Sequence, residues 1–171
     1  MAKSKKEIKL SATRINTFLR CKLKYWFNYH EHLPKLTNPA FKLGIAAHEA
    51  LERAGQLWME KGFFSDEDKK DILKLYDEVS VKEGIFDFAI HKEGKELVKN
   101  RLNNFELGKG IINLEYSFGM NGSNDITTEE GVPLIGAIDK VIEADDDTLL
   151  IVDYKTSKTA PTYDDLKTDI Q

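Results

Sequence analysis

Apolar residues in the first 108 positions recur at the three- and four-residue spacing of amphipathic helices. Ser11 is a typical N-cap residue. The helix that it opens carries apolar side chains on one face at Ile15, Phe18, Leu19, Leu23 and Trp26. A second helix is predicted over residues 43–62. Ser65 and Asp68 resemble a capping box that opens a third helix, and a fourth helix is expected over about 90–107.

The pattern changes after residue 108. Residues 111–118 alternate between apolar and polar side chains, as in a strand with one covered face. Residues 134–144 and 148–156 are apolar on both faces, which predicts strands that are covered on both sides. The three aspartates at 145–147 form the turn between these strands, and a last helix is predicted to begin near Thr162.

This order of elements predicts an α/β (α+β) fold, in which a helical N-terminal half precedes a central mixed β-sheet flanked by helices. A length of 171 residues suits one domain. We expect a basic tail at 1–10, a helical part at 11–108 and the sheet at 109–171. Because the last helix stops after two turns at Gln171, the sheet part is expected to be incomplete at its C-terminus.

The distribution of charge predicts a candidate binding surface. The net charge is −4, but residues 1–35 hold nine Lys and Arg against two Glu, which gives +7 and leaves −11 for the remainder. The basic side chains of the first predicted helix are Arg14, Arg20, Lys22 and Lys24. These side chains are expected to contact nucleic-acid phosphates. The alternative is an ordinary solvated helix and tail.

No feature of the sequence indicates secretion or a membrane. No apolar run approaches the roughly 20 residues that span a bilayer, and no apolar signal core follows the basic N-terminus. A single cysteine excludes an internal disulfide and fits a reducing compartment. We therefore expect a cytoplasmic protein.

The last two strands bring charged residues together. If residues 145–147 form a three-residue loop, paired positions sum to 292, so Asp139 lies opposite Asp153 on one face. Lys155 follows on that face, because residues two apart in a strand point the same way. Two facing carboxylates repel each other unless a positive charge lies between them. A divalent cation such as Mg²⁺ fits this arrangement well; the alternative is a lysine that bridges two surface aspartates.

These residues resemble a known family. GAIDK (136–140) and VDYKTSK (152–158) resemble the core of the PD-(D/E)xK nuclease superfamily, and specifically its RecB-like exonuclease branch, which includes CRISPR-associated and phage RecB-like nucleases. LSATRINTFLRCKLKYWF resembles the opening helix of that branch, LGIAAHEAL its G-x-x-x-H helix, and LEYSF its first core strand. Ile138 stands where the name of the superfamily has a proline. Gln171 falls where the family's Q-x-x-x-Y helix begins, which implies a C-terminally truncated chain.

The resemblance implies a restriction-endonuclease-like core with a Mg²⁺ or Mn²⁺ site. Asp139, Asp153 and the backbone carbonyl of Tyr154 would bind the metal, and His48 would be an additional ligand. Glu115 is either part of the outer shell of the metal or an exposed strand position.

The implied activity is hydrolysis of DNA phosphodiester bonds, by an exonuclease, in recombination, repair, or phage or CRISPR DNA processing. Lys155 would orient or deprotonate the attacking water, and Gln171 would help to position the nucleophile or the DNA. Partners would be DNA and a helicase or another recombination or CRISPR protein. The alternative is a nuclease-derived module that binds DNA or protein without cleavage.

Cys21 has two interpretations. In some RecB-like nucleases an equivalent cysteine joins three C-terminal cysteines around a [4Fe–4S] cluster. Such a cluster needs four thiolates, so this chain alone cannot hold one, and Cys21 would be a ligand only if further cysteines follow residue 171. The alternative is a small buried residue on a helix.

Overall fold

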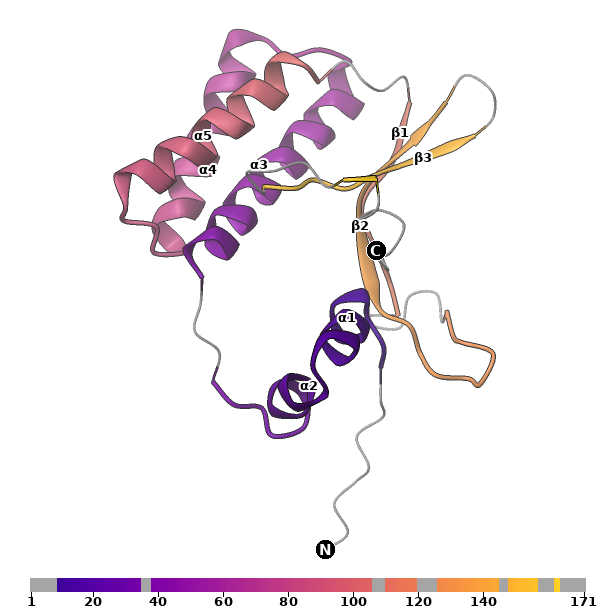
Figure 1. The fold of residues 1–171 in the computed structure, drawn as a ribbon. Helices are drawn as coiled ribbons and strands as arrows, with labels where there is room; N and C mark the ends of the chain where they lie inside the picture. The colour runs from indigo at the N-terminus through magenta and orange to yellow at the C-terminus, as the bar shows by residue number, and fades with distance from the viewer. Residues whose placement is uncertain are drawn as a thin grey trace, which may run out of the picture. The chain divides into compact units, whose positions relative to one another are not determined.

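The computed structural model describes residues 9–34, 38–105, 110–119, 126–144, 148–156 and 162–163. Within these residues it contains five helices and a three-stranded antiparallel sheet, which confirms the predicted α/β class (Figure 1). The sheet described is antiparallel rather than mixed. The chain divides into two compact units, Thr37–Tyr116 with Ile138–Lys158, and Met1–Leu36 with Ser117–Ala137 and Thr159–Gln171. The extent of a single domain stays a prediction.

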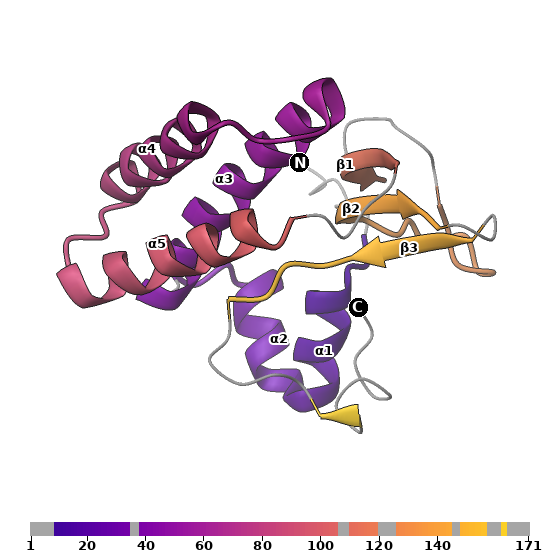
Figure 2. The same cartoon turned by 90° about the horizontal axis from the view of Figure 1, so that it is seen from above.

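The first of these units has a core of three helices, α3 (Pro39–Lys61), α4 (Asp66–Lys82) and α5 (Phe88–Asn103). Helix α3 packs against both α4 and α5 (Figures 1 and 2). The buried face of α3 is rich in alanine, which lets the neighbouring helices approach closely. The core residues are Leu43, Ala46, Ala47, Ala50, Leu51, Ala54, Leu57, Ile72, Tyr76, Val79, Ile85, Val98, Leu102 and Phe105. None of the described helices is both long and apolar enough to cross a membrane.

Local sequence signals set the ends of these helices. The Asn38 side chain accepts a hydrogen bond from the Ala40 N–H at the start of α3, and Gly62 ends the helix with a φ of 73°, a left-handed conformation that glycine adopts without strain. The predicted capping box of α4 is confirmed, because Ser65 and Asp68 each accept a hydrogen bond from the other's backbone N–H.

The sheet is formed by β1 (Ile111–Phe118), β2 (Gly136–Glu143) and β3 (Leu149–Val152), in that order. Strand β2 pairs with β3 in the register Lys140↔Val152 to Glu143↔Leu149, so that paired positions sum to 292. The predicted register of the hairpin is therefore confirmed. The turn at 145–147 itself lies outside the described residues.

The prediction that the last strand is covered on both sides is wrong for the described structure. Leu149, Leu150 and Ile151 of β3 are 62%, 52% and 68% exposed. Strand β3 is the edge of the described sheet, with β2 as its neighbour in the strand order. Its apolar character therefore did not indicate burial. The helix predicted near Thr162 falls almost wholly outside the described residues.

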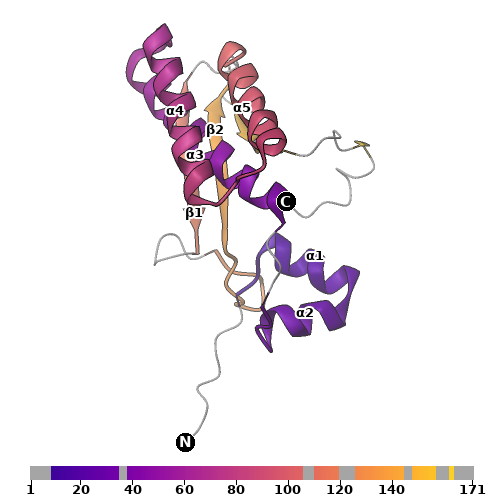
Figure 3. The same cartoon turned by 90° about the vertical axis from the view of Figure 1, so that its left-hand side faces the viewer.

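The second unit contains α1 (Ala12–Arg20) and α2 (Lys22–Tyr29), which lie side by side (Figures 1 and 3). Sequence analysis predicted one helix here. The backbone of Cys21 is extended, with φ −161° and ψ 105°, and this conformation interrupts the helix. Cys21 is exposed and its Sγ caps α2 by accepting a hydrogen bond from the Lys24 N–H. The interpretation of Cys21 as a buried helix residue is therefore wrong.

A close approach between α3 and β1 occurs at Gly55. A Cβ atom at this position would lie 2.6 Å from Cδ2 of Leu114 in β1. Atoms do not pack at that separation, so the absence of a side chain at Gly55 lets this helix and this strand come together.

Candidate metal centre

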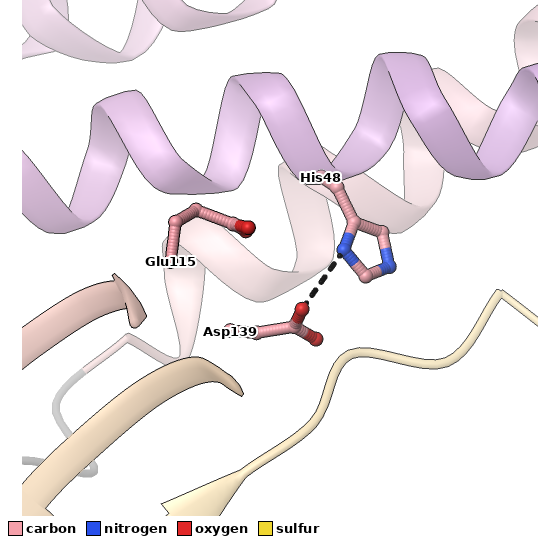
Figure 4. Close-up of side chains that lie close together, drawn as sticks. All are labelled: His48, Glu115 and Asp139. Carbon is pink, nitrogen blue, oxygen red and sulfur yellow. Dashed lines mark ion pairs between the residues drawn. The ribbon is translucent and has the colours of Figure 1, made fainter. Parts of the chain in front are cut away.

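Three side chains from three separate elements converge in the first unit. His48 comes from α3, Glu115 from β1 and Asp139 from β2, and one ligand atom from each lies within 4.8 Å of the others (Figure 4). All three residues are partly buried. Imidazole nitrogens and carboxylate oxygens are common ligands of divalent metals, so this cluster is a candidate metal centre.

The backbone of Glu115 is unusual for a strand residue. Its φ is 47°, in the left-handed region that non-glycine residues rarely adopt. Such a conformation costs on the order of 1–3 kcal/mol and is often found at functional sites. The sequence pattern predicted regular alternation through residues 111–118, and the left-handed backbone at Glu115 interrupts that regularity at one of the three members of the cluster.

His48 connects two of the groups that the family resemblance assigns to the metal. Its Nδ1 lies 3.3 Å from Oδ1 of Asp139, and its Nε2 lies 2.9 Å from the backbone carbonyl oxygen of Tyr154. A carboxylate and a carbonyl both accept hydrogen bonds, so this arrangement favours the form of the ring with a proton on each nitrogen. The hydrogen bond to Asp139 accordingly raises the pKa of His48, against the opposing effect of burial.

The two carboxyl groups of the cluster have opposite pKa shifts. Burial alone would raise the pKa of Asp139, but hydrogen bonds from His48 and from the Tyr154 N–H, with the charges of His48 and Lys155, lower it overall. Burial raises the pKa of Glu115, and the negative charge of Asp139 adds to that effect. Asp139 is thus the carboxylate whose ionised form the site favours.

Asp153 and Lys155 do not belong to this cluster. Their side chains pair with each other at 2.8 Å between Oδ2 and Nζ, and they are 48% and 46% exposed. The ladder between β2 and β3 ends at Val152, and the next residues are not in a strand. The backbone N–H of Tyr154 donates to Oδ2 of Asp139, so the segment after β3 is attached to the cluster through its main chain.

The other predicted site residues lie elsewhere. Gln171 is outside the described residues. The basic residues Arg20, Lys22 and Lys24 are exposed on α1 and α2, in the second unit. Arg14 is partly buried, donates to the carbonyl of Lys9 and stacks its guanidinium 5.0 Å from the centre of the Tyr29 ring.

Sequence analysis missed Lys140. This residue is fully buried in β2, with Nζ 4.6 Å from the centre of the Phe105 ring. Burial, together with the charge of Arg101, lowers the pKa of Lys140 to about 8. The alternation of residues along β2 could have predicted the burial of Lys140. Lys140 shares a face of the strand with Ile138 and Ile142 and is therefore directed into apolar surroundings.

The comparisons with known proteins give one match. The family model described as the PD-(D/E)XK nuclease superfamily matches residues 9–171, which is nearly the whole chain. No curated protein and no solved structure matches. The matched range includes His48, Glu115 and Asp139, and also the Asp153–Lys155 pair.

Proposed function

Because the chain belongs to the PD-(D/E)XK nuclease superfamily, we propose that it is a metal-dependent deoxyribonuclease, and specifically an exonuclease. The observation that carries this proposal is the convergence of His48, Glu115 and Asp139 within 4.8 Å. A nuclease of this kind hydrolyses phosphodiester bonds with water, which requires an activated nucleophile and compensation of the charge that develops on phosphorus.

The ligand set fits Mg²⁺ or Mn²⁺. Carboxylate and carbonyl oxygens suit both ions, whereas the imidazole of His48 is a softer ligand than the oxygens that Mg²⁺ prefers. We assign His48, Asp139, Glu115 and the carbonyl of Tyr154 as ligands, with Asp153 joining them after its ion pair with Lys155 opens. A bound ion of this type lowers the pKa of its water and neutralises charge on the phosphate.

His48 supports this assignment through its present contacts. In its protonated form the imidazole donates one hydrogen bond to Asp139 and one to the Tyr154 carbonyl, and so holds the two groups together. A ligand nitrogen must be deprotonated before it binds a metal. When protonated, the ring supplies beside Asp139 a positive charge that a bound metal ion would supply instead.

Lys155 is suited to contact the substrate. Its side chain is about half exposed, so its ammonium group can reach a phosphate that lies at the surface of the cluster. There it would orient or deprotonate the attacking water and stabilise the phosphate charge. We propose that Gln171 helps to position the same groups, and that Arg14, Arg20, Lys22 and Lys24 contact DNA phosphates.

A second candidate function is a binding module that holds DNA without cleaving it. The Asp153–Lys155 ion pair favours this alternative, because it joins two groups that the nuclease would use separately. Titration with Mn²⁺ distinguishes the two. Paramagnetic broadening of NMR signals near Asp139 and Asp153 supports the nuclease, and its absence supports the binding module.

The nuclease proposal is tested by incubating the whole chain with end-labelled DNA and Mg²⁺ or Mn²⁺. Asp153→Ala and Lys155→Ala should each reduce cleavage by at least about 100-fold. Matched controls are Asp71→Ala on α4 and Lys92→Ala on α5, two exposed positions away from the cluster. Undiminished cleavage by the Asp153 and Lys155 variants would contradict the mechanism.

A further inference from the structure

A cavity of about 330 Å³ lies next to the candidate metal centre. Its walls come from α3, from the C-terminal half of α5 and from the segment 154–156 that follows β3. His48 and Lys155 line the cavity, so it is continuous with the groups assigned to metal binding and catalysis. All of these residues belong to one compact unit.

The wall of the cavity has an apolar part and a polar part. Ala47 and Leu51 on α3, with Leu97 and Val98 on α5, give it an apolar surface. The end of α5 gives it a polar surface, formed by Asn100 and Arg101 in the helix and by the C-cap residue Asn104. An apolar cavity with a few convergent polar groups is the usual form of a small-molecule site, and the volume lies at the lower end of the range of about 300–1,000 Å³ for such sites.

Arg101 is held in place on this wall. Its Nη1 donates to the carbonyl of Asn104 at 2.9 Å, and its guanidinium lies 5.5 Å from the centre of the Phe105 ring and 5.8 Å from that of Tyr154. A guanidinium has five N–H donors, so this hydrogen bond leaves capacity to bind an anion. Lys155 adds a second positive charge to the lining, so the cavity combines a cationic part with an apolar part.

We propose that this cavity binds the nucleotide adjacent to the scissile phosphate, an inference that rests on the proposed nuclease function. Arg101 binds the phosphate of that nucleotide, because a planar guanidinium matches the geometry of phosphate oxygens. The sugar and base pack on the apolar wall formed by Leu51, Leu97 and Val98. Asn100 and Asn104 can each donate to and accept from the polar edge of the base.

The position of the cavity next to the metal centre supports one nucleotide as its occupant. Successive phosphates follow one another along a strand, so a phosphate at the metal centre brings a neighbouring nucleotide with it. The cavity begins at His48 and Lys155, where the scissile phosphate would lie, and its polar wall is on the far helix. Helix α5 is thereby assigned to substrate positioning, although none of its residues is in the metal cluster.

The test fills the cavity with a larger side chain. Leu97 is 38% exposed, so Leu97→Trp can extend into the cavity without entering the buried core. Val81→Trp on α4 is the matched control, because Val81 is 64% exposed and does not line the cavity. Two substrates are compared with Mn²⁺: a single-stranded oligonucleotide, and bis(4-nitrophenyl) phosphate, a phosphodiester without flanking nucleotides.

We expect Leu97→Trp to raise KM for the oligonucleotide at least about tenfold, with unchanged hydrolysis of bis(4-nitrophenyl) phosphate. Arg101→Gln should raise the same KM, and Arg101→Lys should restore part of the loss because it keeps the charge. An unchanged KM in Leu97→Trp, with the variant folded by circular dichroism, would overturn the proposal. Equal loss on both substrates would also overturn it, because the effect would then lie at the metal centre.

A binding measurement separates this inference from the nuclease proposal. The dinucleotide pdTpdT is titrated without divalent metal, and the amide NMR signals of α5 are followed. Shifts that centre on residues 97–104 and disappear in Leu97→Trp support the cavity even if no cleavage occurs with any metal. The absence of such shifts would reject the cavity, whether or not the protein is a nuclease.

Discussion

The candidate centre has an inner part and an outer part that are built differently. The inner part is formed by His48, Glu115 and Asp139, which are partly buried and come from one helix and two strands. The outer part is formed by Asp153 and Lys155, which are about half exposed and follow the last strand of the hairpin. The inner side chains are thus more buried than the outer ones, and the two outer side chains form an ion pair with each other.

This difference separates two tasks. A metal ligand must be held in place before the ion arrives, because ordering it at that moment weakens binding. Asp139 meets this requirement through its bonds to His48 and to the Tyr154 N–H. A side chain that contacts the substrate, as proposed for Lys155, must instead be accessible from solvent. We therefore expect substitutions in the inner part to affect metal affinity first, and those in the outer part to affect the rate first.

The largest expected effect is that of Asp139→Asn on metal binding. Removal of this charge should weaken Mn²⁺ binding by at least about 100-fold. Residues that only hydrogen-bond to a metal ligand already change metal affinity by about 10–100-fold when they are replaced, and Asp139 is proposed to bind the metal directly. Asp153→Asn should weaken it less, by about tenfold, since Asp153 must first leave Lys155. Isothermal titration of both variants measures the difference. Equal losses would show that the two parts are not distinct.

Lys155→Ala should lower the cleavage rate by about 100-fold at saturating Mn²⁺. The affinity for Mn²⁺ should stay the same or become slightly tighter, because the substitution frees the Asp153 carboxylate from its ion pair. Single-turnover cleavage together with Mn²⁺ titration separates the two quantities. A large fall in Mn²⁺ affinity would place Lys155 in the inner part.

The pH dependence of metal binding should depend on His48. Its pKa is raised, so protons compete with the metal to a higher pH than for an ordinary histidine. Below that pKa, the Mn²⁺ affinity should fall by about tenfold per pH unit, and binding should release a proton. Without metal the dependence has the opposite sign. The His48–Asp139 pair stabilises the fold while His48 is protonated and Asp139 is ionised, so its contribution is lost as pH rises through the raised pKa of His48 and also as pH falls through the lowered pKa of Asp139. His48→Gln should flatten both profiles, and a steep residual slope would assign the proton to another group.

The smallest expected effect concerns Lys140, whose side chain lies on the face of β2 opposite Asp139. Burial lowers the pKa of Lys140 to about 8 in the folded protein. Between this pKa and the ordinary lysine pKa, the unfolded chain binds more protons at this position than the folded protein does. The free energy of unfolding therefore rises with pH over that interval. Lys140→Met should remove this rise and increase the free energy of unfolding at pH 7 by about 1 kcal/mol. Urea unfolding at several pH values measures it, with Lys92→Met as an exposed control.

The parts of this structure that could be predicted are those that local chemistry determines. The capping box at Ser65 and Asp68 and the register of the hairpin both depend on residues a few positions apart, and both are confirmed. The assignment of Asp153 to the metal remains a proposal, because the ladder ends one residue before it.

Other features depend on packing that a single sequence does not reveal. The break at Cys21 has no glycine or proline to mark it. The exposure of β3 depends on which elements lie over it, not on its own apolar residues. The left-handed backbone of Glu115 is imposed by its surroundings, since glutamate has no preference for that conformation. Cavities such as the one beside α5 arise from three segments distant in sequence.

The contact between Gly55 and Leu114 has a consequence for the candidate metal centre. Gly55 lies about two helical turns after His48 on α3, and Leu114 directly precedes Glu115 on β1. Any side chain at Gly55 would push Leu114 away from the helix, since even a Cβ would lie 2.6 Å from it. A substitution at Gly55 would therefore disturb β1 one residue before Glu115, so the helix surface opposite the strand helps to determine where this candidate ligand lies.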